Sequence, residues 1–183
     1  MTEITEKHRE WATVDRMREM LGSVRRDYEI TQTYTLFAGI LCWTIQRIRS
    51  KDDKTELTQR FRDLCTELKR EPVIEFAKHL RTTPRQISPH SEIAFNDLSL
   101  FETMNENPKS LEVLVALRNA IAHGDARRVL PLNNSGRLVG YQFICRPKKD
   151  EQRQWQVEVA LNREGMGQIA DELARRFCYA AID

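Results

Sequence analysis

Hydrophobic side chains in the first two thirds of the chain recur every three to four residues, which is the period of an amphipathic helix. The pattern predicts helices at residues 5–22, 28–49, 54–69, 72–79 and 109–123. Pro72 suits the first turn of the short helix, and Asn107 with Pro108 suits the start of the last one. Residues 82–90 contain two prolines and predict a loop, whereas residues 92–105 predict no regular element.

The helix predicted at residues 28–49 is apolar on two faces. The main stripe contains Tyr34, Phe37, Ala38, Leu41, Ile45 and Ile48, and the second stripe contains Leu36, Ile40 and Trp43. A helix with two apolar faces is usually buried on both. The second face therefore packs either against another helix of the same bundle or against a second copy of the chain.

The hydrophobic period changes from helical to alternating in the last third of the chain. Residues 139–145 and 155–161 each alternate apolar with polar side chains, and the segment between them is polar, which predicts a β-hairpin. Asn162 or Arg163 then begins a final helix. The predicted fold is mainly α, a single domain of residues 1–183 with a helical bundle at about 5–124, a small hairpin at about 137–161 and a C-terminal helix at about 163–181.

Composition and charge are those of a soluble globular protein. Of the 183 residues, 40% are hydrophobic and 31% are charged, which excludes a disordered chain. The formal net charge is only +2, so nucleic-acid binding would have to come from a local patch. The longest apolar run, residues 36–45, is half of the about 20 residues that span a bilayer, and no signal peptide is recognisable. We therefore expect a cytoplasmic protein without membrane attachment.

The four cysteines predict neither a zinc site nor a disulfide framework. Cys42, Cys65, Cys145 and Cys178 are far apart in the chain and form no Cys-x-x-Cys pair. We expect reduced thiols that pack as small core residues. The sequence therefore predicts no metal site and no cofactor.

One predicted helix ends in a group of polar side chains that could carry chemistry. Residues 117–124 read Leu-Arg-Asn-Ala-Ile-Ala-His-Gly, and Gly124 is a typical helix stop. At about 100° per residue, Asn119 and His123 lie about 40° apart on one face, and Arg118 lies about 140° from His123. The opposite, core-facing stripe contains Leu114, Leu117 and Ile121.

These residue types suit phosphate chemistry. Arg118 offers a fixed charge and a fork of N–H donors for a phosphate. His123 can exchange a proton near neutral pH, which general acid–base catalysis needs. Arg127 and Arg128 follow directly in the chain and add positive charge beside this corner. The same pattern also fits a plain helix end, in which His123 bonds the last carbonyls and Arg118 forms an ion pair at the surface or at an interface.

The segment from Leu117 to Gly124 resembles the Arg-x4–6-His signature of the HEPN superfamily, in which a polar residue such as Asn119 often follows the arginine. The resemblance implies an α-helical bundle and a metal-independent RNA endonuclease. In that reaction the 2′-hydroxyl attacks the adjacent phosphate and leaves a 2′,3′-cyclic phosphate and a 5′-hydroxyl. The resemblance implies a bacterial or plasmid-borne subfamily in which a β-hairpin precedes the last helix. It also implies a toxin or phage-defence role with an antitoxin or regulatory partner.

The resemblance also implies roles for single residues and a homodimer. His123 is the base or acid, Arg118 stabilises the pentacoordinate phosphorane, and Asn119 orients His123 or a phosphate oxygen. Each chain offers one positioned histidine, so two chains must face each other across a shared cleft. Arg127 and Arg128 would flank this cleft and are the candidate RNA-binding residues. We expect the second apolar stripe of the helix at residues 28–49 to form part of that interface.

One position departs from the family pattern. HEPN toxins that are paired with nucleotidyltransferase antitoxins often carry a tyrosine two residues after the histidine, where this chain has Asp125. This departure argues against control of the protein through modification of a tyrosine at this position. The alternative function is a non-catalytic HEPN-like dimeric module for binding or interaction, which the near-neutral charge of the chain favours.

Overall fold

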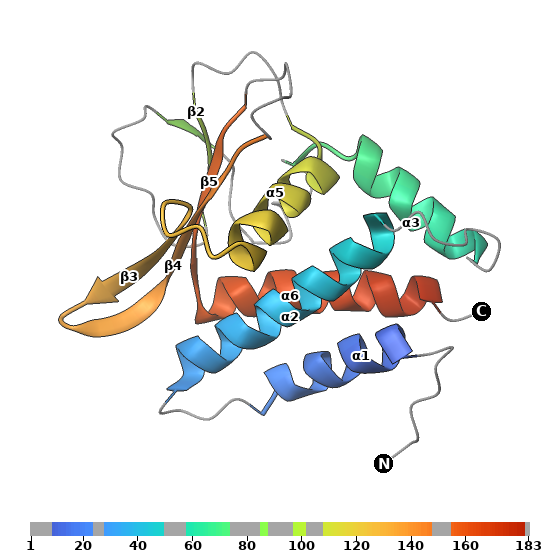
Figure 1. Cartoon of the computed structure of the whole chain (residues 1–183), viewed down its shortest axis with the longest axis horizontal. Helices are drawn as coiled ribbons and strands as arrows, with labels where there is room; N and C mark the ends of the chain where they lie inside the picture. The colour runs from blue at the N-terminus through green and yellow to red at the C-terminus, as the bar shows by residue number, and fades with distance from the viewer. Residues whose placement is uncertain are drawn as a thin grey trace.

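The computed structural model describes residues 9–23, 28–49, 58–73, 85–87, 97–101, 108–147 and 155–181. Its helices are α1 (Arg9–Leu21), α2 (Glu29–Arg49), α3 (Gln59–Arg70), α5 (Ser110–Ala122) and α6 (Arg163–Ala181). Its strands are β1 (Arg85–Ile87), β2 (Asp97–Phe101), β3 (Val129–Asn134), β4 (Arg137–Cys145) and β5 (Val157–Asn162). The described part is mainly α-helical with a smaller sheet at one end, as the hydrophobic pattern predicts (Figure 1). The short helix predicted at residues 72–79 lies almost wholly outside the described residues.

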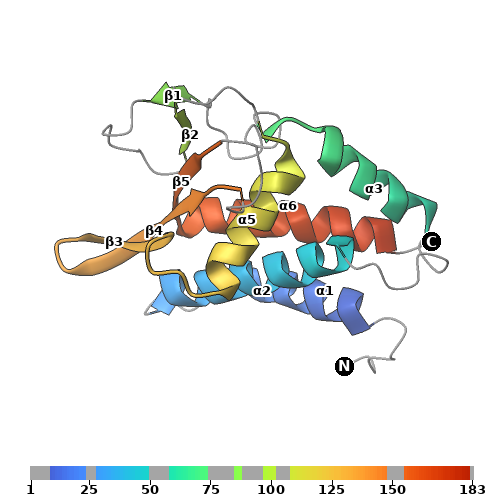
Figure 2. The same ribbon diagram turned by 45° about the horizontal axis from the view of Figure 1, so that its top comes forward.

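Helix α2 lies at the centre of the bundle. It packs against α1, α5, α6 and strand β4, and Figures 1 and 2 show it running beside α1 and α6. Its buried side chains are Thr33, Phe37, Ile40, Leu41, Thr44 and Ile45. Of the second apolar face, Ile40 is covered by the same chain, as in the first of the two alternatives that the sequence leaves open.

The predicted interface stripe on α2 is only partly available to a second copy of the chain. Ile40 is 0% exposed and belongs to the hydrophobic core, so its predicted place in a subunit interface is wrong. At about 100° per residue, Ile40 lies only about 60° from Phe37 around the helix, and both side chains therefore point into the bundle. Leu36 is half-buried, whereas Trp43 remains 37% exposed.

The strands form a five-stranded sheet in the order β1-β2-β5-β4-β3. β1 and β2 are parallel, and the other neighbours are antiparallel. The predicted hairpin is confirmed as β4 and β5, with Tyr141 opposite Leu161. The sheet is larger than predicted, because residues 85–87, expected in a loop, form β1 and because β2 lies in the stretch with no predicted element. β1 has only three residues, too few for an alternating pattern to show.

Strand β3 pairs with β4 through a tight turn at Ser135 and Gly136. Both residues have positive φ angles, 50° and 77°, as in the turns whose twist matches that of the flanking strands. Pro131 and the polar end of β3 hide its alternation, but the Ser-Gly dipeptide is a turn signal that could have revealed this second hairpin. Figure 2 shows the β3–β4 hairpin projecting from the body of the molecule.

Helix α6 begins where the sequence predicts it. The Asn162 Oδ1 atom accepts a hydrogen bond from the Gly165 N–H at 3.0 Å, which satisfies one of the open donors of the first turn. α6 packs against α1, α2, α3 and β5 and is therefore integral to the bundle. Arg176 ties it to α3 by an ion pair with Glu67, at 3.2 Å, and Glu172 of α6 itself holds the same guanidinium, at 2.6 Å.

Helix α5 begins at Ser110, later than the predicted start at Pro108. The Ser110 N–H donates to the carbonyl of Glu71 at 2.9 Å, and the Val73 N–H donates to the carbonyl of Pro108 at 3.1 Å. These bonds form a bridge of the β type with the end of α3 and keep the backbone at Lys109 extended. The Glu112 carboxylate also accepts the Lys109 N–H at 2.7 Å, so the start of α5 has both a local cap and a contact with a distant segment.

Candidate functional site

A Schellman motif closes the C-terminal end of α5. Gly124 has a φ of +59°, its N–H donates to the carbonyl of Ile121 at 3.1 Å, and the Asp125 N–H donates to the carbonyl of Ala120 at 3.2 Å. His123 is the cap residue, with φ −89° and ψ −4°. The predicted helix stop at Gly124 is confirmed, and it leaves His123 exposed at the end of the helix.

Arg118 lies before this end and is half-buried against α2. Its Nη1 atom donates to Asn119 Oδ1 at 3.0 Å, and its Nη2 atom donates to Gln46 Oε1. Its Nε atom is buried and has no hydrogen-bond partner among the described residues. Two neutral amide groups, one from α5 and one from α2, thus fix the guanidinium in place.

No carboxylate offsets the charge of Arg118 within the described residues. Arg18, Arg163 and Arg176, by contrast, each pair with a carboxylate. The charge of Arg118 acts on Cys42: burial raises the pKa of this thiol, and the nearby guanidinium lowers it in part. An arginine that is oriented but not neutralised is suited to bind an anion such as a phosphate.

Arg118 and His123 are linked through Asn119 rather than by direct contact. The Asn119 side chain accepts from Arg118, and the Asn119 backbone carbonyl accepts from the His123 N–H at 3.0 Å. The imidazole of His123 makes no hydrogen bond within the part of the chain that the structure describes. The plain helix-end interpretation is met in part: His123 is the cap and its backbone N–H donates to the carbonyl of Asn119, whereas Arg118 forms no ion pair with another described residue.

In the loop after α5, the two candidate RNA-binding arginines differ in exposure and in charge pairing. Asp125 Oδ1 accepts the backbone N–H of Arg127 at 3.0 Å, and Asp125 Oδ2 lies 3.1 Å from Arg128 Nε. Arg128 is half-buried and its charge is offset by Asp125, whereas Arg127 is exposed. Asp125, which stands where the family resemblance expects a tyrosine, thus shapes the loop.

Gln46 is the site residue that the sequence does not reveal. It lies on the exposed side of α2, 72 positions before its partner Arg118. One glutamine at the end of an apolar run is ordinary, and no pattern in the sequence predicts that α5 packs across α2 at this point. Only the contact between the two helices identifies Gln46.

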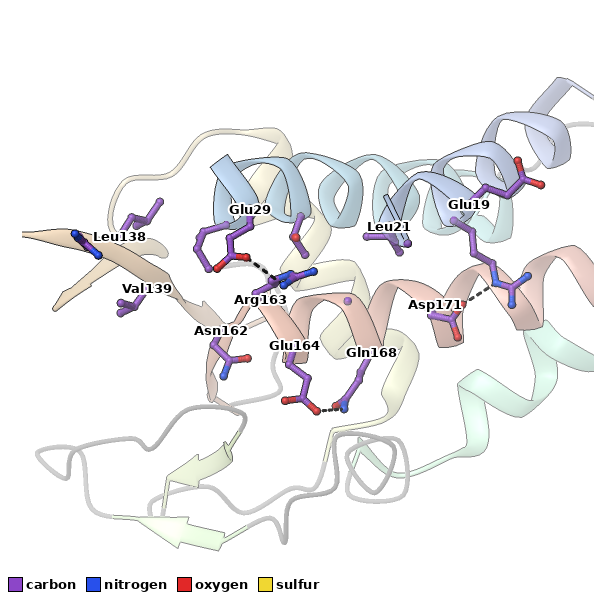
Figure 3. Close-up of a pocket in the computed structure, with 16 residues that line it drawn as sticks. Glu19, Leu21, Glu29, Leu138, Val139, Asn162, Arg163, Glu164, Gln168 and Asp171 are labelled. Carbon is purple, nitrogen blue, oxygen red and sulfur yellow. Dashed lines mark hydrogen bonds and ion pairs between the residues drawn. The ribbon is translucent and has the colours of Figure 1, made fainter. Parts of the chain in front are cut away.

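A separate pocket of about 1020 Å³ lies between α1, the start of α2, the start of β4 and the start of α6 (Figure 3). In Figure 3, Arg163 bonds Glu29 at 3.1 Å and Arg18 bonds Asp171 at 2.7 Å. No predicted site residue lines this pocket. Because two of its three arginines are paired with carboxylates, it offers little free charge to a phosphate.

Within the described ranges, no group of three or more His, Cys, Asp and Glu side chains is placed to hold a metal ion. Cys145 and Cys178 are buried and Cys42 and Cys65 are half-buried, and the structure shows no disulfide bond among these four described residues. None of the described helices combines the length and the apolar character that crossing a membrane requires. Comparisons of the chain with protein-family models, with curated proteins and with solved structures gave no match. The end of α5 is therefore the feature from which a function can be inferred.

Proposed function

We propose that the chain is a metal-independent endoribonuclease of the HEPN type. The observation that carries this proposal is the environment of Arg118. Its guanidinium is held by the amide oxygens of Gln46 and Asn119, with no carboxylate partner in the described residues, near the helix end that exposes His123. This arrangement offers a phosphate both a fixed positive charge and a group that transfers protons.

In this proposal Arg118 stabilises the negative charge that develops on the phosphate oxygens in the transition state. Two hydrogen bonds orient the guanidinium before RNA arrives, so that little reorganisation is needed during the reaction. Each terminal nitrogen of an arginine carries two N–H groups, and the second one of each remains for the phosphate. Gln46 and Asn119 act through Arg118 and are positioning residues.

The reaction needs two proton transfers. A bond forms from the 2′-oxygen to phosphorus while the bond from phosphorus to the 5′-oxygen breaks. The proton of the 2′-hydroxyl passes to one imidazole, and a second, protonated imidazole gives its proton to the leaving 5′-oxygen. One chain supplies one positioned His123, so a two-fold homodimer is needed to supply the pair.

The substrate in this proposal is RNA, and the setting is the cytoplasm. The lack of a disulfide bond among the four described cysteines suits a reducing compartment. Exposed Arg127 would contact the RNA backbone close to His123, whereas Arg128 would contribute less because Asp125 offsets its charge. The resemblance to HEPN proteins further suggests a toxin or phage-defence role, with an antitoxin or regulatory partner.

The second candidate is a non-catalytic dimeric module for binding or interaction. The ion pair between Asp125 and Arg128 favours it, because this pair and the net charge of +2 leave only a weak attractive field for RNA. Such a module would use the same helix end to bind a partner. It would dimerise and would leave RNA intact.

The deciding experiment is to incubate the purified chain with total RNA in EDTA and to map the new RNA ends. Wild type should generate 2′,3′-cyclic phosphate ends, and His123→Ala and Arg118→Ala should not. Cleavage that needs added metal, or that survives in His123→Ala, would contradict the proposal. No cleavage under any condition, together with no toxicity in cells, would favour the binding module.

Folding controls separate loss of chemistry from loss of structure. Arg118 and His123 lie at the surface of the bundle, so their replacement by alanine should lower the free energy of unfolding by about 1 kcal/mol or less. Leu114 is 3% exposed, and Leu114→Ala should cost about 2–5 kcal/mol. Urea unfolding measures both. An unfolded Arg118→Ala or His123→Ala variant would mark that residue as structural.

A further inference from the structure

Two tyrosines stack at the seam between α2 and β4. The ring centroids of Tyr34 and Tyr141 lie 4.3 Å apart, with an angle of 29° between the ring planes. Phe143, which is 0% exposed, lies 6.4 Å from Tyr34 and 6.3 Å from Tyr141, measured between centroids. An aromatic pair that rests on a buried ring is held rigidly.

The two tyrosines are not enclosed by the core. Tyr34 and Tyr141 are both half-buried, and neither hydroxyl makes a hydrogen bond to another described residue. Because a tyrosine hydroxyl inside a core usually finds a partner, these hydroxyls are expected to face water. Burial raises the pKa of both side chains, so the rings remain neutral near pH 7 and do not repel a phosphate.

Helix α5, which carries Arg118, packs against both α2 and β4, the two elements that carry the tyrosines. At about 100° per residue, Tyr34 lies about 120° around α2 from Gln46. Along the axis of α2, Tyr34 lies about 18 Å from Gln46. Figures 1 and 2 show the C-terminal end of α5 coming down over α2, with the following loop leading toward the β3–β4 hairpin.

We infer that Tyr34 and Tyr141 form a stacking platform for one unpaired base of the RNA. The inference depends on the proposed function, because Arg118 would hold the scissile phosphate and the strand would run from there along the α2–α5 seam toward β4. Unpaired RNA bases stack on aromatic side chains, whereas bases within a duplex are not available. The substrate class is therefore single-stranded RNA, with little preference for the identity of the stacked base, since every base has a π-face.

A binding experiment tests the platform independently of cleavage. The probe is a short single-stranded RNA with 2′-O-methyl groups, which cannot be cleaved by 2′-hydroxyl attack, measured by fluorescence anisotropy. Tyr141→Leu and Tyr34→Leu should each weaken binding about 5- to 150-fold, which is the loss of affinity expected when one base–aromatic stack is removed. Tyr141→Phe keeps the ring and should bind within about twofold of wild type. Thermal unfolding of each variant reports whether the fold is intact.

A base-deletion experiment tests the same contact, and its wild-type and Tyr141→Phe measurements remain informative where a leucine variant folds poorly. Abasic positions are placed one at a time along the same oligonucleotide. One position should weaken binding to wild type and to Tyr141→Phe but have no further effect on Tyr141→Leu. Equal losses in all three proteins at every position would overturn the platform. Normal RNA cleavage by Tyr141→Leu, with an unchanged KM, would also overturn the platform but leave the proposed function intact. Absence of both cleavage and RNA binding in wild type would overturn the platform and the proposed function together.

Discussion

The capacity of Arg118 to bind an anion depends on the groups around its guanidinium. An exposed arginine that pairs with a carboxylate loses most of its field, as Arg18 does with Asp171. Arg118 donates instead to the amide oxygens of Gln46 and Asn119, which orient the guanidinium without cancelling its charge. The chemistry of the side chain at position 46 therefore controls whether this charge stays available to a substrate.

Gln46→Glu should separate the charge of Arg118 from its position. The substitution keeps the size of the side chain but places a carboxylate against the guanidinium, and a phosphate must then compete with it. We expect RNA cleavage, measured as kcat/KM, to fall about 10- to 100-fold. The free energy of unfolding should stay the same or rise by up to about 1 kcal/mol, as for other partly exposed ion pairs.

Gln59→Glu is the matched control for this prediction. Gln59 is exposed on α3, so the variant makes the same change of charge away from the end of α5. Cleavage by Gln59→Glu should remain within about twofold of wild type, because exposed charges at a distance are screened. Full activity in Gln46→Glu would show that the charge of Arg118 does not act on the phosphate.

At the residue scale, the sequence predicts the parts of the site that are neighbours in the chain. Asn119 follows Arg118 and Gly124 follows His123, so helix geometry alone relates them. Gln46 is 72 positions from Arg118, and its role depends on where α5 crosses α2. Asp125 offsets the charge of Arg128 because the loop after α5 brings the two side chains together. The residue types alone do not predict this ion pair.

At the scale of elements, the backbone conformation at the end of α5 determines the position of His123. The left-handed conformation of Gly124 reverses the chain and satisfies the last carbonyls of the helix. A Cβ atom at this position would meet no heavy atom within 4 Å. The requirement for glycine is therefore one of backbone conformation and not of space.

Gly124→Ala should destabilise the chain and also impair cleavage. An alanine at φ +59° costs about 1–2 kcal/mol, which corresponds to a fall of roughly 2–8 °C in Tm for a chain of this size. If the backbone relaxes to relieve this strain, His123 moves with it, so kcat should fall more than stability alone explains. Thermal unfolding and cleavage kinetics measure the two effects.

Gly136→Ala provides the comparison. Gly136 has a φ of +77° at the tip of the β3–β4 hairpin, and an added Cβ atom would again meet nothing within 4 Å. The variant should lose a similar amount of stability and keep its activity. Equal losses of kcat in Gly124→Ala and Gly136→Ala would mean that the end of α5 has no special part in catalysis.

Elements with strong local signals are the ones that the sequence predicts. The start of α6 at Asn162 and the β4–β5 hairpin follow from a capping residue and from clear alternation. β1 is too short to show a period, and its place in the sheet comes from pairing with β2. The start of α5 is held in part by a bridge between Lys109 and Pro72, a contact that no local pattern contains.

At the scale of the whole molecule, the fold joins segments from both halves of the chain around one helix. α1, α5, α6 and β4 all contact α2, and the candidate site lies where α5 crosses it. The two apolar faces of α2 were compatible with a central helix or with a subunit interface, because periodicity reports burial and not the identity of the partner. Three-dimensional packing resolves this for Ile40, while Trp43 stays 37% exposed and available to a partner.

A homodimer is the assembly that the proposed chemistry requires. Two copies of His123 must reach one phosphate, so the ends of two α5 helices must meet across a two-fold axis. His123 and Arg127 are exposed at this end, which leaves the surface open for such an approach. Analytical ultracentrifugation should show a dimer at micromolar concentration. A monomer under conditions where RNA is cleaved would rule out a shared site.

Subunit mixing tests whether both histidines serve each phosphate. Wild type and His123→Ala are mixed in equal amounts and allowed to exchange, and cleavage is compared with wild type at the same total chain concentration. If a heterodimer with one histidine is inactive, only wild-type homodimers remain, and activity should fall to about one quarter. If each chain acts alone, activity should fall only to about one half, the value also expected immediately after mixing, before subunits exchange. A final value of about one half after complete exchange, verified with a tagged subunit, would show that a single His123 is sufficient at each site.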